Sequence, residues 1–133
     1  MKSFIIRLKK GDEAISSLVS FCQKNNIKFG SFSGIGAAQS AKLAIYDLDK
    51  KEYIRKELSG ILEILNYAGN VSQMDDKTII HSHATLSNKT FAAFGGHVDE
   101  LVVAATCEII LHQLDIELVR KHDDEIGLNL LDI

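Results

Sequence analysis

The sequence predicts an α+β domain with a largely antiparallel β-sheet of about seven strands and one main helix. Only one segment, which includes Ile15, Leu18 and Cys22, repeats apolar residues at the three-and-four spacing of an amphipathic helix. The other apolar segments alternate with period two or are rich in β-branched residues, as strands are. The turns between them are too short for the crossovers of parallel strands. With 133 residues, 46% of them hydrophobic, the chain is expected to form a single domain over residues 1–133.

Seven segments are predicted to form strands. They are residues 3–8, 29–47, 52–58, 61–67, 78–86, 91–96 and 102–119. The helix follows the first strand, with Asp12 as a candidate N-cap and an end near Asn25 and Asn26. In the second strand, Gly34 and Gly36 predict a bulge, a kink or a close approach of another backbone. The last residues, HDDEIGLNLLDI, close the chain without a predicted element.

The distribution of charge does not favour a chain that grips phosphates with its own surface. The formal net charge is −3 and the pI is about 5.9. Basic residues are interleaved with acids, as where Lys50, Lys51 and Arg55 lie among Asp49 and Glu52. Nucleic-acid-binding surfaces usually carry a basic patch or stripe. Non-specific binding to nucleic acid is therefore not supported by composition.

The cysteines and the start of the chain predict a cytoplasmic protein. Cys22 and Cys107 are too few and too far apart for a disulfide framework, and no C-x-x-C motif occurs. Both are expected to be buried as small apolar residues. The first residues lack the apolar core and cleavage site of a signal peptide. No apolar run approaches the roughly 18 residues of a membrane-spanning helix, so no membrane partner is expected.

Three of the five histidines lie in HSHATLSNKTFAAFGGH, residues 81–97. His81 and His83 are two apart and share one face of a strand. The polar residues after them predict a hairpin turn. A three-residue loop, 88–90, would place His81 directly opposite His97, and a two-residue loop would place Gly96 there. In either register His97 comes near the first two rings, and the two glycines before it would let the chain bend and aim it inward.

This cluster predicts a metal site at His81, His83 and His97. Three neutral imidazoles suit a divalent ion, Zn²⁺ first, and leave a fourth coordination position open, as in catalytic zinc sites. Iron, nickel and copper also accept imidazole ligands. The alternative is that these histidines are ordinary polar residues on an exposed strand. His112 and His122 have no such neighbours in sequence and are expected to be structural or surface residues.

Glu63 is the candidate catalytic residue. In ILEILNY, residues 61–67, both strand faces are mostly apolar, which predicts that the helix or a neighbouring subunit covers them. A carboxylate in such a place needs a partner. Glu63 would be a fourth ligand, a hydrogen-bond acceptor behind a ligand, or a general base. The alternative is an edge position exposed to water.

Several segments together resemble the PPC (plants and prokaryotes conserved) domain family, in its stand-alone prokaryotic form. They are GIGAAQSAKLAIYD (34–47), LEILNYAGNVS (62–72), HSHATLS (81–87), GGHV (95–98) and the tail HDDEIGLNLL. The resemblance implies a compact α+β fold around an antiparallel sheet of about seven strands, assembled as a homotrimer. It also implies that the three histidines bind metal, with Glu63 and Asn70 near the site.

Three functions follow from these observations. The first is metal binding with hydrolytic chemistry on an unknown small molecule, in which a metal-bound water is the nucleophile and Glu63 accepts a proton. The second is a DNA-associated regulatory role, by analogy with plant members of the family that join this domain to AT-hooks. The chain contains no proline and therefore no such hook. The third is a non-catalytic interaction module, with the tail EIGLNLLDI as a contact.

Overall fold

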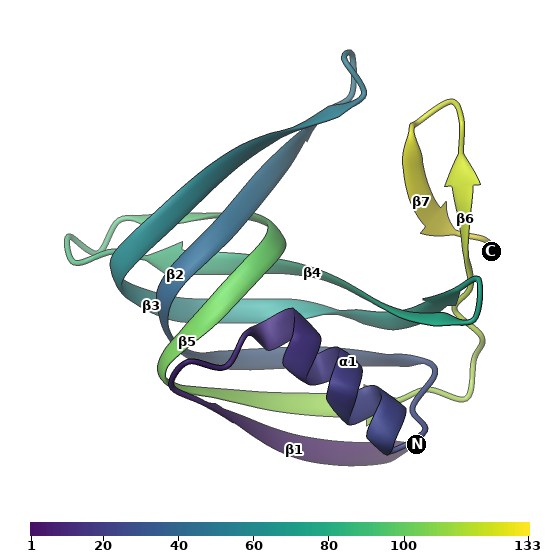
Figure 1. The fold of residues 1–133 in the computed structure, drawn as a ribbon, viewed down its shortest axis with the longest axis horizontal. Helices are drawn as coiled ribbons and strands as arrows, with labels where there is room; N and C mark the ends of the chain where they lie inside the picture. The colour runs from purple at the N-terminus through teal and green to yellow at the C-terminus, as the bar shows by residue number, and fades with distance from the viewer.

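The structure, a computed structural model, describes residues 1–133. Its elements are β1 (Lys2–Lys9), α1 (Ala14–Lys24), β2 (Gly30–Asp47), β3 (Glu52–Met74), β4 (Lys77–Ser87), β5 (Ala93–Gln113), β6 (Arg120–Asp123) and β7 (Leu128–Leu131). Five strands form one sheet in the order β1–β5–β2–β3–β4, and β6 and β7 form a separate hairpin (Figure 1). These strands all pair in antiparallel fashion, as predicted.

The long strand β5 connects distant parts of the sheet. Its end pairs with β1, its start pairs with β4, and β2 lies beside it over most of its length. Because β4 also pairs with β3 at the far end of the strand order, the sheet closes on itself where β4 meets β5. This closure places the start of β5 beside the C-terminal half of β4, residues 83–87.

The predicted fold class and number of strands agree with the structure, but the strands are divided differently. The segments 52–58 and 61–67 belong to one strand, β3, because the chain passes through Gly60 at a positive φ of 111° without leaving the sheet. The segments 91–96 and 102–119 are likewise replaced by β5, which ends at Gln113. The tail, for which the sequence predicts no element, forms β6 and β7.

The glycines of β2 lie where two strands approach closely, as predicted. The register between β2 and β3 shifts between Gly34 and Gly36. A Cβ atom on Gly36 would lie only 2.0 Å from the carbonyl oxygen of Thr106 on β5. Any side chain at this position would therefore push β2 and β5 apart.

The helix α1 covers one face of the sheet. Leu18 and Cys22 on its inner side are fully buried and share one apolar core with Cys107 and Ile109 of β5. Both cysteines are free and buried, as expected. The helix has 11 residues and is not long and apolar enough to cross a membrane.

The N-cap of α1 is Glu13 and not the predicted Asp12. Its Oε1 accepts a hydrogen bond from the backbone N–H of Ser16 at 2.8 Å, and its Oε2 accepts one from the backbone N–H of Leu101 in β5 at 3.2 Å. One longer side chain thus caps the helix and ties it to the sheet. Asp12 instead accepts a bond from the N–H of Lys9 and closes the preceding turn.

The β6–β7 hairpin covers the opposite face of the sheet only near Asn70 and Ser72, and the rest of that face is not covered by this chain. A row of directly paired residues crosses it: Ile5, Ile110, Ser33, Ala68 and His83. Directly paired residues point to the same side of a sheet, so the apolar end of the row and the histidine end share one surface. Ile5 is 84% exposed and Ile35, on the same face of β2, is 61% exposed. We call Ile5, Ile35 and Ile110 the outer apolar patch.

Candidate metal centre

His81 and His83 lie two apart on one face of β4, and His97 lies near the start of β5. His97 is directly opposite His83, and Gly96 is opposite Ala84. Both predicted registers are therefore wrong, because the loop between the strands spans the five residues 88–92. The strand pairing nevertheless brings the third imidazole beside the first two, as predicted.

The longer loop is organised by the side chain of Asn88. Its Oδ1 accepts hydrogen bonds from the N–H and the hydroxyl of Thr90, at 2.9 and 2.7 Å, and from the N–H of Ala92 at 3.3 Å. Phe91 adopts a positive φ of 64°. Asparagine is a common turn residue for this reason, so the sequence predicts a turn here without fixing its length.

Gly95 and Gly96 allow close packing and do not introduce a bend. Neither has a positive φ. A Cβ atom on Gly95 would lie 2.4 Å from the carbonyl oxygen of Ala84 on β4, and one on Gly96 would lie 2.7 Å from that of Ala44 on β2. The two glycines let β5 fit between its neighbours immediately before His97, and so they act differently from the sequence-based expectation.

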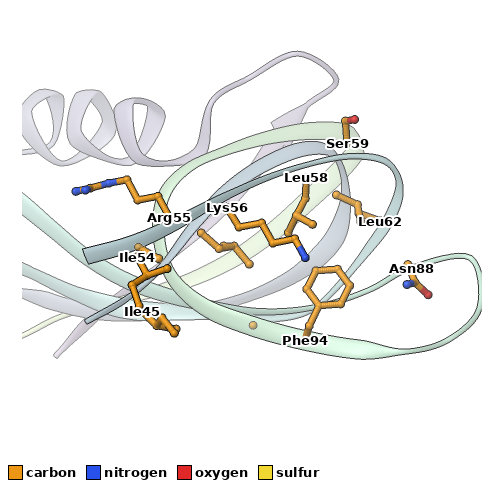
Figure 2. A pocket seen from close by; sticks show the side chains of 12 residues that line it. Ile45, Ile54, Arg55, Lys56, Leu58, Ser59, Leu62, Asn88 and Phe94 are labelled. Atoms are coloured by element: carbon orange, nitrogen blue, oxygen red, sulfur yellow. The ribbon is translucent and has the colours of Figure 1, made fainter. Parts of the chain in front are cut away.

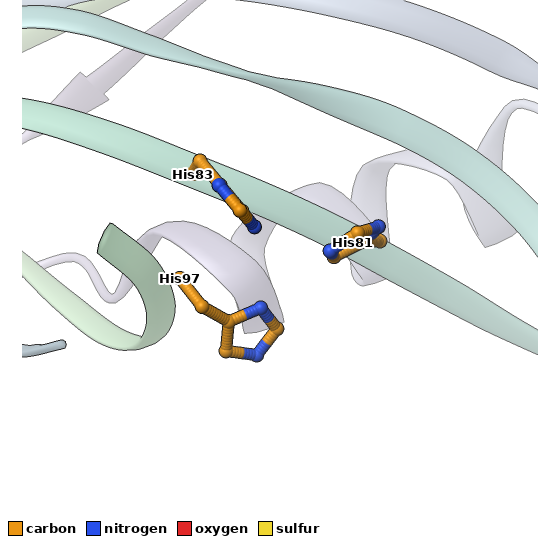
Figure 3. Close-up of side chains that lie close together, drawn as sticks. All are labelled: His81, His83 and His97. Atoms are coloured by element: carbon orange, nitrogen blue, oxygen red, sulfur yellow. The ribbon is translucent and has the colours of Figure 1, made fainter. Parts of the chain in front are cut away.

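The three rings converge on one region of space (Figure 3). The ring centroids are 5.2 Å apart for His81 and His83, 5.3 Å for His81 and His97, and 5.6 Å for His83 and His97. One nitrogen from each ring lies within 4.8 Å of the other two. The common centre of three such atoms is at most about 2.8 Å from each, compared with Zn–N bonds of about 2.0–2.1 Å. Small side-chain rotations would therefore bring all three nitrogens into bonding range of one ion.

The surroundings keep two of these imidazoles neutral, which is the form that binds metal. Burial, together with the positive charges of Arg120 and the other two histidines, lowers the pKa of His81 to about 4. Burial also lowers the pKa of His97, although the carboxylate of Asp99 opposes this shift. At neutral pH both rings therefore have a free lone pair.

His97 is held by neighbours on both sides. The ring of Tyr53 stacks on it with centroids 5.0 Å apart, and Oδ1 of Asp99 lies 3.6 Å from its Nε2. Asp99 also accepts a hydrogen bond from Nε of Arg55 at 2.9 Å. The other nitrogen, Nδ1, is buried and has no hydrogen-bond partner in the chain. A buried polar atom is rarely left unpaired, and a carboxylate behind the second ring nitrogen is typical of metal-binding histidines.

Of the two residues expected near the site, the chain brings one to the histidines. Asn70 of β3 is directly opposite His81. Glu63 is exposed and lies opposite Ser87, four residues along β4 from His83 and so about 13 Å away. Its side chain lines a different hollow. Within one chain, Glu63 is therefore separate from the candidate metal centre.

His81 and His97 open into a hollow of about 470 Å³. It is lined by Tyr53, Ile79, Ile80, His81, His97, Arg120, His122, Gly127, Leu128, Asn129 and Leu130. The sequence-based reasoning missed Tyr53 and Arg120, because no motif marks either residue. His122 also lines this hollow, where its Nδ1 is 3.0 Å from Oδ1 of Asn129. His112 lies elsewhere, with its Nδ1 2.8 Å from the hydroxyl of Ser3.

A second, larger hollow of about 560 Å³ is mainly apolar (Figure 2). Its walls include Ile45, Ile54 and Leu58 on the β2–β3 ribbon and Phe94 on β5. No histidine or acidic residue lines it. Of these two hollows, the smaller one beside the histidines is therefore the one with side chains suited to metal binding.

The sequence model of the Plants and Prokaryotes Conserved (PCC) domain, whose name is also written PPC, matches residues 1–115. The chain belongs to this family. No match was found among curated proteins.

Solved structures of similar proteins share the fold of this PCC domain. A metal-containing protein from Archaeoglobus fulgidus is 36% identical, with a TM-score of 0.92 over 98% of this chain and 93% of that one. A PPC protein from Pyrococcus horikoshii is 30% identical, with a TM-score of 0.93 over 100% of this chain and 92% of that one. A protein from Bacteroides thetaiotaomicron, provisionally described as DNA-binding, is 27% identical, with a TM-score of 0.94 over 98% and 91%.

The P. horikoshii structure covers the whole of this chain, whereas the family match ends at residue 115. The hairpin β6–β7 therefore belongs to the shared fold although it lies beyond the matched sequence. This matters for the site, since the hairpin forms one wall of the histidine hollow.

Proposed function

We propose that this PCC domain is a homotrimeric metal-binding protein in which His81, His83 and His97 hold one divalent ion. The observation that carries the proposal is the convergence of three ring nitrogens to within 4.8 Å of one another. The buried, unpartnered Nδ1 of His97 supports it, and so does the description of the A. fulgidus relative as metal-containing.

Zn²⁺ is the ion that fits this donor set best. Imidazole is a favoured zinc ligand, and zinc held by three side chains keeps a fourth position open. When bound, such an ion would supply Lewis-acid chemistry suited to the hydrolysis of a small molecule. Around it, the chain keeps His81 and His97 neutral, packs Tyr53 on the ring of His97 and places Asp99 behind that ring.

Glu63 enters this mechanism as a general base only from another subunit, because in its own chain it faces a separate hollow. In a trimer, the carboxylate would have to reach the histidine hollow of a neighbouring chain. A Glu63→Gln variant should then keep its full metal content and lose hydrolytic turnover. Loss of metal in this variant would instead indicate that Glu63 is a ligand.

Two apolar surfaces support assembly into a trimer. A ring of three chains needs two different, complementary surfaces on each chain. The outer apolar patch is one such surface, and the hollow lined by Ile45, Ile54 and Phe94 is another (Figure 2). Exposed apolar patches of this kind are uncommon on monomers.

Metal analysis of protein purified without a histidine tag tests the proposal. We expect about one zinc per chain in the wild type, as one three-histidine site requires, and a loss of most of it in His97→Ala. His112→Ala is the matched control, because His112 lies outside the cluster, and it should keep its metal. Metal-free wild type, or equal metal in all three proteins, would refute the metal site and leave DNA association or an interaction module as the remaining functions.

A second candidate function, DNA association, is favoured only by the provisional description of relatives. The net charge of −3 per chain, tripled in a trimer, opposes it. Fluorescence anisotropy with duplex DNA at about 50 mM salt tests this function, because phosphate contacts are strongest at low salt. An absence of binding under these conditions would exclude it.

We also propose that residues 1–133 act as one functional domain in the cytoplasm. The first part is supported by the tail hairpin, which contributes to the histidine hollow. The second is supported by the two free cysteines, which suit a reducing compartment. Separate expression of residues 1–115 checks the first part: this fragment should lose stability relative to the full chain.

A further inference from the structure

Arg120 is a buried cation without a counter-charge. It is the first residue of β6 and is 8% exposed. Its guanidinium donates hydrogen bonds to Oγ of Ser72 at 2.8 Å, to Oδ1 of Asn70 at 2.8 Å and to the carbonyl oxygen of Asn129 at 2.9 Å. All three acceptors are neutral, and none of the ion pairs in the chain includes Arg120. Arginine is almost never this buried unless it is paired.

The hydrogen-bonding capacity of Arg120 is not exhausted. A guanidinium has five N–H donors, and these three bonds leave one hydrogen on each terminal nitrogen without a partner in the chain. The existing bonds join β6 to β3 and β7 and fix the side chain in place. They do not balance its positive charge. A guanidinium fork matches the two oxygens of a carboxylate or phosphate group.

The guanidinium lies beside the candidate metal centre. Arg120 lines the same hollow as His81 and His97, and its acceptor Asn70 is directly opposite His81. A divalent ion on the histidines would add a second positive centre to this hollow. Two positive centres so close repel each other unless an anion lies between them.

The chain itself does not supply that anion. Asp99, the acid beside His97, is hydrogen-bonded to Arg55. Asp124 is exposed and lies 3.5 Å from Nε2 of His122. The remaining walls are mostly uncharged, and a hollow of about 470 Å³ is the size of a small-molecule site.

We propose that Arg120 binds the oxyanion group of a small ligand, a carboxylate or a phosphate, in the hollow beside His81 and His97. Small organic acids or phosphate esters are then the substrate class of the site. The inference rests on the proposed function for the ion at the histidines, whereas the contribution of Arg120 is measurable without any metal.

An NMR titration of EDTA-treated and zinc-loaded protein with inorganic phosphate, and separately with acetate, tests the inference. We expect saturable shifts around Asn70 and β6, and a Kd that rises at least about tenfold in Arg120→Met, because a charge-assisted fork is lost. Lys121→Met is the matched control, since it removes the same charge one residue away, from a side chain that faces a different hollow. Its Kd should stay unchanged. Tighter binding of phosphate than of acetate would identify phosphate esters, and the reverse would identify organic acids.

Asn70→Asp provides a second variant in case Arg120→Met undocks the hairpin. It keeps the acceptor 2.8 Å from the guanidinium and adds an internal carboxylate, which should compete with both anions and weaken their binding while Arg120 remains. Unchanged anion binding in a folded Asn70→Asp or Arg120→Met protein, or no binding by the wild type with or without zinc, would overturn the inference.

Metal content measured on the same samples separates the two proposals. Wild type that lacks zinc but binds phosphate through Arg120 would refute the metal site and leave the role of Arg120 standing. Full zinc content with anion binding that is indifferent to Arg120 would refute this inference alone.

Discussion

At the scale of single residues, the chemistry of the site depends on imidazoles that stay neutral. His81 lies between two other rings and close to a buried guanidinium, and every one of these neighbours disfavours its protonated form. The same surroundings that keep the ring neutral for metal binding make its protonation at low pH unfavourable in the folded state. This has a direct consequence for the stability of the metal-free protein.

We expect the metal-free protein to lose stability as the pH falls from about 6.5 to about 4, the ordinary and folded-state pKa values of His81. In this window the unfolded chain binds a proton that the folded chain does not, so protonation favours unfolding. Below about pH 4 both the folded and the unfolded chain carry the proton on His81, so this residue causes no further loss of stability. Urea denaturation of EDTA-treated wild type and His81→Gln across this range measures it. The wild type should lose more free energy of unfolding than the variant, and parallel curves would contradict the assigned pKa.

At the scale of elements, the join between α1 and the sheet depends on Glu13. One carboxylate accepts bonds from the first turn of the helix and from Leu101 of β5. Loss of an N-cap costs about 0.5–2 kcal/mol, and here a strand N–H loses its partner as well.

Glu13→Ala should therefore lower the free energy of unfolding by about 1–3 kcal/mol, given the cost of an unpaired backbone donor. Urea denaturation gives the value directly. Glu117→Ala is a suitable control, because Glu117 is exposed and should change stability by less than about 0.5 kcal/mol. Similar stabilities for the two variants would show that the contacts of Glu13 contribute nothing net.

The sequence predicted the type of each element better than the residues at which the element begins and ends. The period-two pattern identifies strands through residues 52–58 and 61–67, but Gly60 reads as a break and the chain continues through it. The spacing of His81 and His83 fixes their common face, since alternation is a local property of a strand. Loop length is not local in this sense: it depends on the bonds of Asn88, which both short-loop predictions ignored.

The parts of the site contributed by the tail could not be predicted at all. Arg120 and His122 reach the hollow because a four-residue strand returns beside β3, and neither carries a local signal. For Glu63, the apolar residues on both strand faces predicted cover by the helix or a neighbouring subunit. Within one chain, Ile61, Glu63 and Leu65 are exposed because they alternate with the buried residues Leu62 and Ile64 and point away from the core.

At the scale of the whole molecule, the uncovered sheet face is the feature that most needs explanation. A single chain buries its apolar residues against α1 on one side and leaves the outer apolar patch in water on the other. Burial of such residues against a second copy would stabilise an assembly at roughly 25 cal/mol for each Å² removed from water.

We expect light scattering coupled to size exclusion to give a mass of about 44 kDa, three times the 14.7 kDa of one chain. Ile5→Lys combined with Ile110→Lys should lower this mass, because buried unpaired charges oppose association. Ile116→Lys is the control: Ile116 is 67% exposed but lies outside the patch. A wild-type mass near 15 kDa would rule out the trimer.

The turn at residues 88–92 has a consequence for how relatives of this protein can diverge. Surface loops usually accept insertions and deletions during evolution. Here an insertion or deletion that shifted the pairing of β4 and β5 by one residue would place the ring at position 97 on the opposite side of the sheet. Apart from Asn88, whose side chain organises the turn, the identities of these residues can vary between species, but relatives that keep three converging imidazoles should align across this turn without gaps.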